Sequence, residues 1–285
     1  MNSFHYWIFR QWSSRSLATL RKGGFMQKYI YLCEDSTEGI FTAVYQAWEG
    51  NHGHANNKVQ IASSDYNTEL FCEYIEVETD LAKAEKVART LKKKVSYEFY
   101  EQILLASLSY DCRKADSIYR SIILGLHMGS SVLNHLANED ISRIAKLKQN
   151  VTNEILHLNG FLRFEELEKG LLLGRIKPKN DIIRLLGDHF SDRFPEEHFL
   201  IADTVRSSFV MHTPKQTKYF IYPDFDFSSE LLSTTEAEKY YRELWCKFVD
   251  TIAIKPRENL KLQQQMLPLR FRDYMPEFSM PRSLR

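Results

Sequence analysis

The stretch FLRFEELEKGLLLGRIK, residues 161–177, decides the fold class. Two short runs, 161–167 and 170–177, flank the turn Glu168-Lys169-Gly170. This pattern predicts an antiparallel β-hairpin. Three later runs with short connections predict further antiparallel strands, and hence a meander: residues 198–205, 208–213 and 218–222.

Helical periodicity dominates the chain before this sheet. Residues 80–158 carry apolar side chains at spacings of three and four, beginning with Leu81, Ala84 and Val87. Upstream, residues 28–33 predict a short strand, and either Asp35 or Ser36 is expected to cap the helix that follows. The N-terminal and middle regions are therefore predicted to be mainly helical.

The residues after the sheet predict two more helices. Ser233-Thr234-Thr235-Glu236 has the spacing of a capping box, and Tyr240 to Ile252 carry a wide apolar face. Pro256 suits the first turn of a second helix, which must stop near Pro268. The predicted class is α+β, with a helical N-terminal and middle region, an antiparallel meander sheet and C-terminal helices packed on it.

Residues 26–278 are expected to form one domain, followed by a tail at 279–285. Residues 1–25 contain no acidic side chain, and Lys22-Gly23-Gly24 can be encoded by a bacterial ribosome-binding sequence just before Met26. We therefore expect 1–25 to be a translated upstream or disordered leader without a structural role. An organelle transit peptide is the alternative interpretation.

Several classes of protein have no support in the sequence. The four cysteines form no C-x-x-C pair, which favours reduced thiols in a cytoplasmic protein. No apolar run approaches the roughly 20 residues that span a bilayer. His52 and His54 have no third ligand nearby, so we expect no metal site. Nucleotide-binding and hydrolase motifs are also missing, so no cofactor is expected and enzyme activity remains open.

Positive charge is concentrated in two segments, although the net charge is only +1. Residues 81–150 hold 12 basic and 7 acidic side chains, and residues 255–285 hold 7 and 3. Such segments can form an anion-binding face, or they can be solvated helix surfaces.

Three stretches, 29–49, 160–212 and 240–278, together resemble a bacterial family assigned to DNA metabolism or DNA repair. The second stretch includes HFSDRF at 189–194 and ADTVR at 202–206. Members of the family are usually encoded beside a radical SAM protein, and related domains are fused to uracil-DNA-glycosylase-like domains. The resemblance therefore implies DNA and a radical SAM protein as partners, but no established catalytic residue. This sequence departs from the family where Phe199 replaces a usual Trp, and where Phe271-Arg272 replaces a frequent Tyr-Trp.

The resemblance supplies three catalytic candidates: His189, Asp192 and Asp203. His189 has a structural alternative, in which its ring is bonded to the backbone or to Asp192 near a helix end. Asp203 has one too, in which it forms a turn-fixing ion pair with Arg206.

A second group of candidates carries side chains that bind phosphates or base edges. Arg193 could instead pair with Glu196 or Glu197. The C-terminal members could instead tie a terminal helix to the body, with Leu260, Met266 and Leu267 packed inward. The nucleic-acid-binding candidates are Arg193, Arg206, Arg257, Asn259, Gln263, Arg270 and Arg272.

These observations favour a nucleic-acid-binding accessory protein of DNA repair that acts with a radical SAM partner. Two alternatives stay open. One is a nuclease- or glycosylase-like enzyme acting on DNA, and the other is a scaffold that docks a protein through its C-terminal helix.

Overall fold

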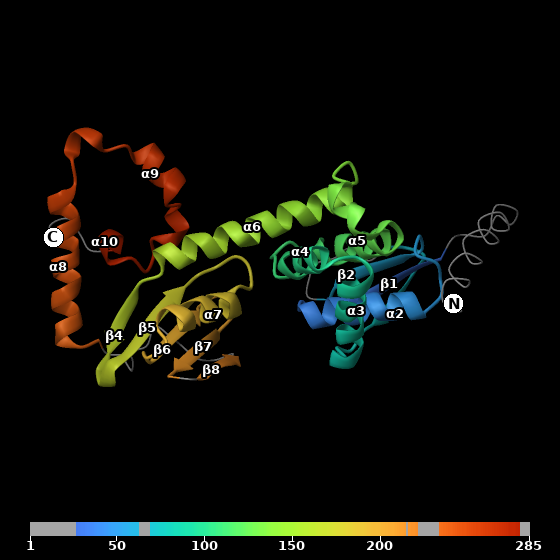
Figure 1. Cartoon of the computed structure of the whole chain (residues 1–285), viewed down its shortest axis with the longest axis horizontal. Helices are drawn as coiled ribbons and strands as arrows, with labels where there is room; N and C mark the ends of the chain where they lie inside the picture. Colours follow the sequence, from blue (N-terminus) through green and yellow to red (C-terminus); the bar gives the residue numbers. More distant parts are fainter. Residues whose placement is uncertain (1–26, 63–68, 215, 222–233, 280–285) are drawn as a thin grey trace, which may run out of the picture. The chain divides into compact units, whose positions relative to one another are not determined.

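The structure is a computed structural model that describes residues 27–62, 69–214, 216–221 and 234–279 (Figure 1). By their internal packing the residues form two compact units, Met1–Leu91 and Lys92–Arg285. The sequence predicts a single domain over residues 26–278. The expected leader, 1–25, lies outside the described residues, as does the tail after Ser279. The predicted α+β class is confirmed, with helices before and after a mostly antiparallel sheet.

A three-stranded parallel sheet forms the centre of the first unit. Its strands are β1 (Lys28–Cys33), β2 (Asn57–Ile61) and β3 (Cys72–Glu76), in the order β2-β1-β3. The predicted strand β1 is confirmed, and its last four residues are buried. The two flanking strands were not predicted, because each has only five residues with polar side chains among them.

Helix α2 (Thr37–Glu49) follows β1 directly and packs on β1 and β2. Ser36 is its N-cap, because the Ser36 hydroxyl accepts a hydrogen bond from the Gly39 N–H at 3.0 Å. A Cβ atom at Gly39 would lie 2.7 Å from the Glu34 carbonyl oxygen. The tight connection between β1 and α2 therefore requires glycine at this position.

Three helices of the second unit pack on one another: α4 (Tyr97–Ser107), α5 (Lys114–Met128) and α6 (Glu139–Phe161). The predicted stripe of Ile118 and Ile122 is buried between them. Gly129, at φ +66°, ends α5 and begins the 3-10 helix η2 (Gly129–Asn134). No helix in the described ranges has a stretch both long and apolar enough to span a membrane.

The second sheet contains the predicted hairpin. Strands β4 (Phe164–Leu167) and β5 (Leu171–Ile176) are antiparallel, and the 3-10 turn η3 (Glu168–Gly170) joins them with Gly170 at φ +73°. Three more strands complete the order β4-β5-β6-β7-β8, namely β6 (Phe199–Asp203), β7 (Ser208–Thr213) and β8 (Gln216–Ile221).

One strand pair departs from the predicted meander. Strands β5 and β6 are parallel, with Leu172 opposite Phe199, whereas the other neighbouring pairs in this sheet are antiparallel. Helix α7 (Ile183–Arg193) connects them and carries the chain back, so that β6 enters in the same direction as β5. The antiparallel prediction is therefore correct for β7 and β8 and wrong for β6 against β5.

An apolar core lies between this sheet and helices α6 and α7. Leu158 of α6, Leu186 and Phe190 of α7, and Phe199 and Ile201 of β6 belong to it and are almost completely buried. Burying one such side chain contributes about 1.5–3 kcal/mol to stability. The core therefore fixes the positions of α6 and α7 on the sheet.

The C-terminal segment consists of α8 (Glu236–Ile252), η4 (Lys255–Arg257), α9 (Leu260–Met266), η5 (Leu269–Phe271) and α10 (Pro276–Ser279). Thr235 is the N-cap of α8, and its hydroxyl accepts from the Glu238 N–H at 3.1 Å. The expected cap Ser233 lies outside the described residues. Pro256 lies in η4 rather than in the first turn of α9, whereas α9 ends before Pro268 as predicted.

A buried carboxylate on α6 holds the C-terminal segment to the body. Glu154 has a fully buried side chain, and it accepts a hydrogen bond at 2.7 Å from the guanidinium of Arg270. Glu154 also accepts from the backbone N–H groups of Lys179 and Asn180 at 3.0 and 2.9 Å, and from the Asn180 side-chain amide at 2.7 Å. The Asn180 oxygen in turn accepts from the Tyr110 N–H. One carboxylate thus joins α6, the β5–α7 connection and η5.

We predict that Glu154→Ala lowers the free energy of unfolding by about 3 kcal/mol, because it leaves two backbone donors and a guanidinium without their acceptor. Urea denaturation of the full chain measures this change. The matched control is Glu101→Ala on α4, an exposed carboxylate whose loss should change stability by less than about 0.5 kcal/mol. Equal effects at the two positions would contradict the joining role of Glu154.

Candidate functional site

Asp203 and Arg206 form the predicted ion pair at the end of β6. The Arg206 guanidinium donates to Asp203 Oδ2 at 3.0 Å, and the Val205 and Arg206 N–H groups donate to Asp203 Oδ1 at 2.8 and 3.3 Å. Arg206 also donates to the carbonyls of Pro178 and Lys179. Burial raises the pKa of Asp203, while these hydrogen bonds act to lower it. The pair fixes the turn and ties it to the β5–α7 connection.

The other two catalytic candidates lie on α7. The His189 ring is half-buried and contacts the Phe190 ring edge-on, with 5.0 Å between the centroids, rather than bonding to Asp192. Asp192 itself is exposed. No interaction joins these residues to Asp203, whose oxygens are engaged in the turn. Within the described ranges, no group of three His, Cys, Asp or Glu side chains could hold a metal ion.

Arg193, a candidate for nucleic-acid binding, is exposed at the end of α7. Its guanidinium lies 5.7 Å from the centre of the Phe194 ring. In this part of the structure Arg193 packs on its aromatic neighbour, and the expected pairing with Glu196 or Glu197 is not seen.

Two of the C-terminal arginines help to fold the chain. Arg270 is paired with the buried Glu154, and Arg272 donates twice to the Leu267 carbonyl, at 3.3 and 3.0 Å, and lies 4.4 Å from the Phe278 ring. The Arg270 contact agrees with the alternative in which a C-terminal cation ties the end of the chain to the body, whereas the Arg272 contacts stay within residues 267–278. They leave Arg270 and Arg272 less available to DNA phosphates than the sequence suggested.

The remaining C-terminal candidates are exposed on η4 and α9. Asn259 is the N-cap of α9, because its side-chain oxygen accepts from the Leu262 N–H at 3.0 Å, and its carbonyl accepts from the Gln263 N–H one turn later at 2.9 Å. Leu260 and Met266 are each 67% exposed. The alternative in which these two side chains pack inward is therefore not seen, whereas Leu267 does pack against the core.

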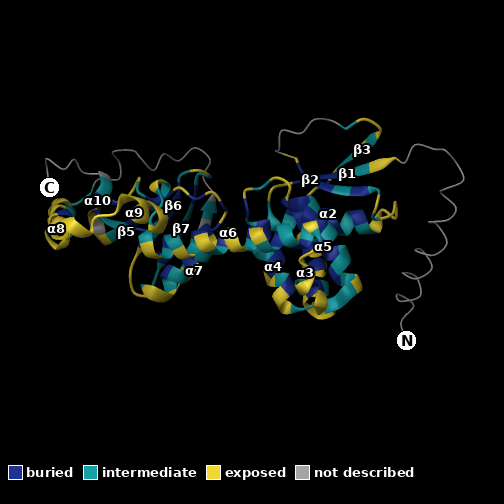
Figure 2. Ribbon diagram, turned by 90° about the horizontal axis from the view of Figure 1, so that it is seen from above, coloured by how far each residue is buried: buried dark blue, intermediate teal, exposed yellow. Residues whose placement is uncertain are grey.

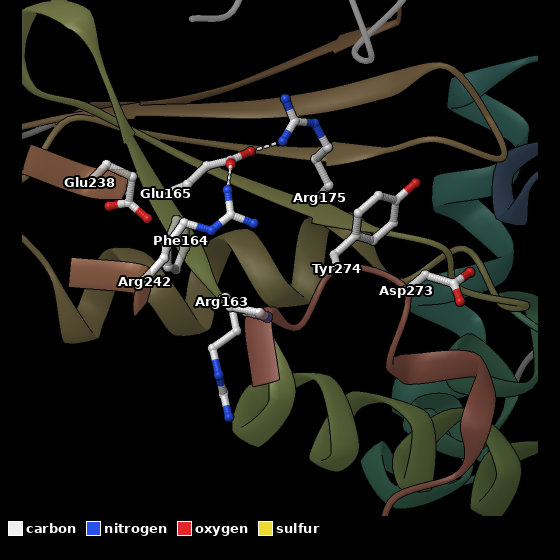
Figure 3. Close-up of a pocket in the computed structure, with 9 residues that line it drawn as sticks. Arg163, Phe164, Glu165, Arg175, Glu238, Arg242, Asp273 and Tyr274 are labelled. Atoms are coloured by element: carbon white, nitrogen blue, oxygen red, sulfur yellow. Dashed lines mark hydrogen bonds and ion pairs between the residues drawn. The ribbon is translucent and has the colours of Figure 1, made fainter. Parts of the chain in front are cut away.

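A pocket of about 160 Å³ lies where β4, β5, α8 and the chain before α10 meet (Figure 3). Glu165 lies at its centre and pairs with both Arg175 and Arg242, the latter at 3.2 Å. Burial lowers the pKa of Arg175, and the nearby charge of Arg242 lowers it further. The lining residues are Arg163, Phe164, Glu165, Arg175, Glu238, Arg242, Asp273, Tyr274 and Pro276.

The charges around this pocket balance one another. The lining includes three arginines and three carboxylates, but Arg163 points away from the centre toward a separate ion pair with Glu277 at 2.9 Å (Figure 3). Arg175 and Arg242 share the Glu165 carboxylate, so neither is a surplus cation for an anionic ligand. We therefore interpret the pocket as a polar joint between the sheet and the C-terminal segment.

Cations dominate the surface of helix α3 (Leu81–Lys94). The helix buries Ala84, Val87 and Leu91, and the Asp80 carboxylate caps its first turn. Its single acidic side chain, Glu85, pairs with Arg89 at 3.5 Å. The ammonium of Lys92 lies 4.2 Å from the Tyr100 ring and 6.0 Å from the Tyr97 ring, and Tyr97 is 67% exposed. The six cations of the helix are Lys83, Lys86, Arg89, Lys92, Lys93 and Lys94.

This geometry defines an α+β protein whose C-terminal segment is held on a five-stranded sheet by buried ion pairs. The model of the family described as Domain of unknown function (DUF4130) matches residues 113–277, more than half of the chain. The chain therefore belongs to this family. No curated protein matches the chain.

We predict that Asp203→Asn destabilises the folded chain by about 1–3 kcal/mol, because it weakens the charge-assisted bonds that hold the β6–β7 turn. Thermal or urea denaturation measures the effect. The control is Asp192→Asn, which changes an exposed carboxylate on α7 and should leave the midpoint unchanged. An Asp203→Asn protein with an unaltered midpoint would show that the carboxylate is not structural.

Proposed function

We propose that this protein is a nucleic-acid-binding accessory of DNA repair that acts with a radical SAM partner protein. The DNA-repair setting and the partner come from the resemblance of residues 29–49, 160–212 and 240–278. The observation that supports nucleic-acid binding is the cationic surface of α3.

The end of α3 combines charge with an exposed aromatic ring. Lys92, Lys93 and Lys94 are all exposed, and Tyr97 follows at the start of α4. Lysine ammonium groups bind phosphates, and a tyrosine ring offers a face on which an unpaired base can stack. The combination of lysine charges and an exposed ring favours binding to the sugar–phosphate backbone over reading of base edges in a groove. It also favours single strands over duplexes.

The alternatives have weaker support. An enzyme that uses His189, Asp192 and Asp203 would need these side chains in one cleft, and Asp203 is instead buried in the β6–β7 turn. The sequence also suggested a DNA contact in the C-terminal segment. Two of its cations, Arg270 and Arg272, are engaged in contacts within the chain. The candidates still exposed on η4 and α9 are Arg257, Asn259 and Gln263. The cations of this stretch, Lys255, Arg257 and Lys261, provide a direct comparison with α3.

We predict that replacing Lys92, Lys93 and Lys94 together by glutamine weakens binding to all DNA sequences alike. The slope of log K against log salt should flatten by about two to three units, roughly one for each lost phosphate contact. Glutamine has nearly the helix propensity of lysine, so α3 should stay folded. Fluorescence anisotropy at several salt concentrations, with single-stranded and duplex DNA, gives the slopes.

The comparison protein carries Lys255→Gln, Arg257→Gln and Lys261→Gln, which removes the same number of charges. Its slope should stay close to that of the unaltered chain. An unchanged slope in the α3 variant, with a flattened slope in the comparison protein, would move the contact to the C-terminal segment. Unchanged slopes in both, or no binding by the unaltered chain, would contradict the proposed function.

A further inference from the structure

Helix α8 is attached to the body by a narrow polar seam, which consists of Glu238, Arg242 and Cys246. Glu238 accepts from the Glu166 N–H at 3.2 Å, Arg242 pairs with Glu165, and the Cys246 thiol lies 3.5 Å from the Pro276 carbonyl. Cys246 is the one residue of α8 that is fully buried. The seam residues are four apart, so they occupy a single stripe along the helix.

The apolar residues of α8 lie beside this seam and stay uncovered by the described part of the chain. Six large side chains are between 41% and 63% exposed, and Figure 2 shows α8 and the following α9 mostly as exposed ribbon. The indole N–H of Trp245 donates to Glu277 at 3.2 Å, and its ring lies 6.0 Å from the Arg163 guanidinium and 5.8 Å from the Phe248 ring. We call these residues the apolar face: Tyr240, Tyr241, Leu244, Trp245, Phe248 and Ile252.

The chain after α8 carries further exposed apolar side chains, because Ile254, Leu260, Leu262 and Met266 are between 53% and 67% exposed. The six side chains of the apolar face, at roughly 100 Å² each when half exposed, present on the order of 600 Å². A stable protein interface buries about 800 Å² on each partner, part of which is polar. The apolar face therefore matches the upper end of the largest apolar patch on a typical monomer and can supply most of one side of a dimer interface.

We infer that the apolar face of α8 is an interface with a second copy of this chain, in which the two α8 helices pair antiparallel. A two-fold axis perpendicular to the helices brings the same edge of each helix together. Glu243 and Lys247 are exposed and four residues apart on one edge of the apolar face. When the axis passes near Trp245, Glu243 of each copy lies opposite Lys247 of the other, so the pairing is self-complementary in charge.

The antiparallel arrangement also matches the remaining charges along this segment. Residues 247–261 carry four basic and two acidic side chains, and residues 236–243 carry two basic and three acidic ones. Antiparallel pairing places the basic half of one copy beside the acidic half of the other, whereas parallel pairing places like halves together. This inference is independent of the proposed DNA contact on α3.

Sedimentation equilibrium of the full chain, from about 1 to 100 μM, tests the interface. The unaltered chain should reach twice the mass of one chain. Phe248→Glu should raise the dissociation constant of the dimer by roughly 100-fold or more, because each of the two copies places a carboxylate in the interface. The matched control is Leu156→Glu on α6, where the leucine is 63% exposed and away from the apolar face. A monomer at 100 μM, or a dimer unaffected by Phe248→Glu, would overturn the inference.

A charge exchange tests the orientation of the helices. Glu243→Lys and Lys247→Glu should each weaken the dimer, because each places like charges opposite one another. The protein with both changes should recover most of the lost affinity. Failure of the double change to recover affinity would overturn the antiparallel pairing about Trp245, even if the apolar face proves to be the interface.

Discussion

The buried carboxylate of Glu154 is the constraint on which the second unit depends. A carboxylate without water is stable only if its oxygens are bonded, and Glu154 meets this requirement with Arg270, Lys179 and Asn180. These partners come from α6, the β5–α7 connection and η5. The apolar core fixes α6 and α7 on the sheet, and Glu154 then determines where the end of the chain must return.

Pairing with a buried carboxylate distinguishes the structural cations from the cations at the surface. Arg270, Arg206 and Arg242 each pair with a carboxylate that is at least 84% buried, so their charges contribute to folding. The lysines at the end of α3 are exposed at the surface instead. The cations of α3 and the apolar face of α8 are thus two surfaces with different chemistry. One suits a polyanion and the other suits a protein.

Local patterns in the sequence were enough to predict much of the fold. Ser36 as an N-cap, Gly170 in the hairpin turn and the Asp203–Arg206 pair each depend on residues within three positions of one another. The interactions that were missed join distant parts of the chain. Arg270 follows Glu154 by 116 residues and Arg242 follows Glu165 by 77, and no local spacing reveals such pairs. The apolar pattern of α8 was visible in the sequence, but the pattern alone did not decide whether that face packs on the sheet or docks another protein.

The most direct test of this account is a double-mutant cycle between Glu154 and Arg270. The free energy of unfolding is measured for the unaltered chain, Glu154→Gln, Arg270→Gln and the protein with both changes. If the pair holds the C-terminal segment to α6, the sum of the two single losses should exceed the loss in the protein with both changes by a coupling energy of about 1–3 kcal/mol. A coupling energy near zero would show that Arg270 is free of Glu154, and would return it to the residues available for DNA.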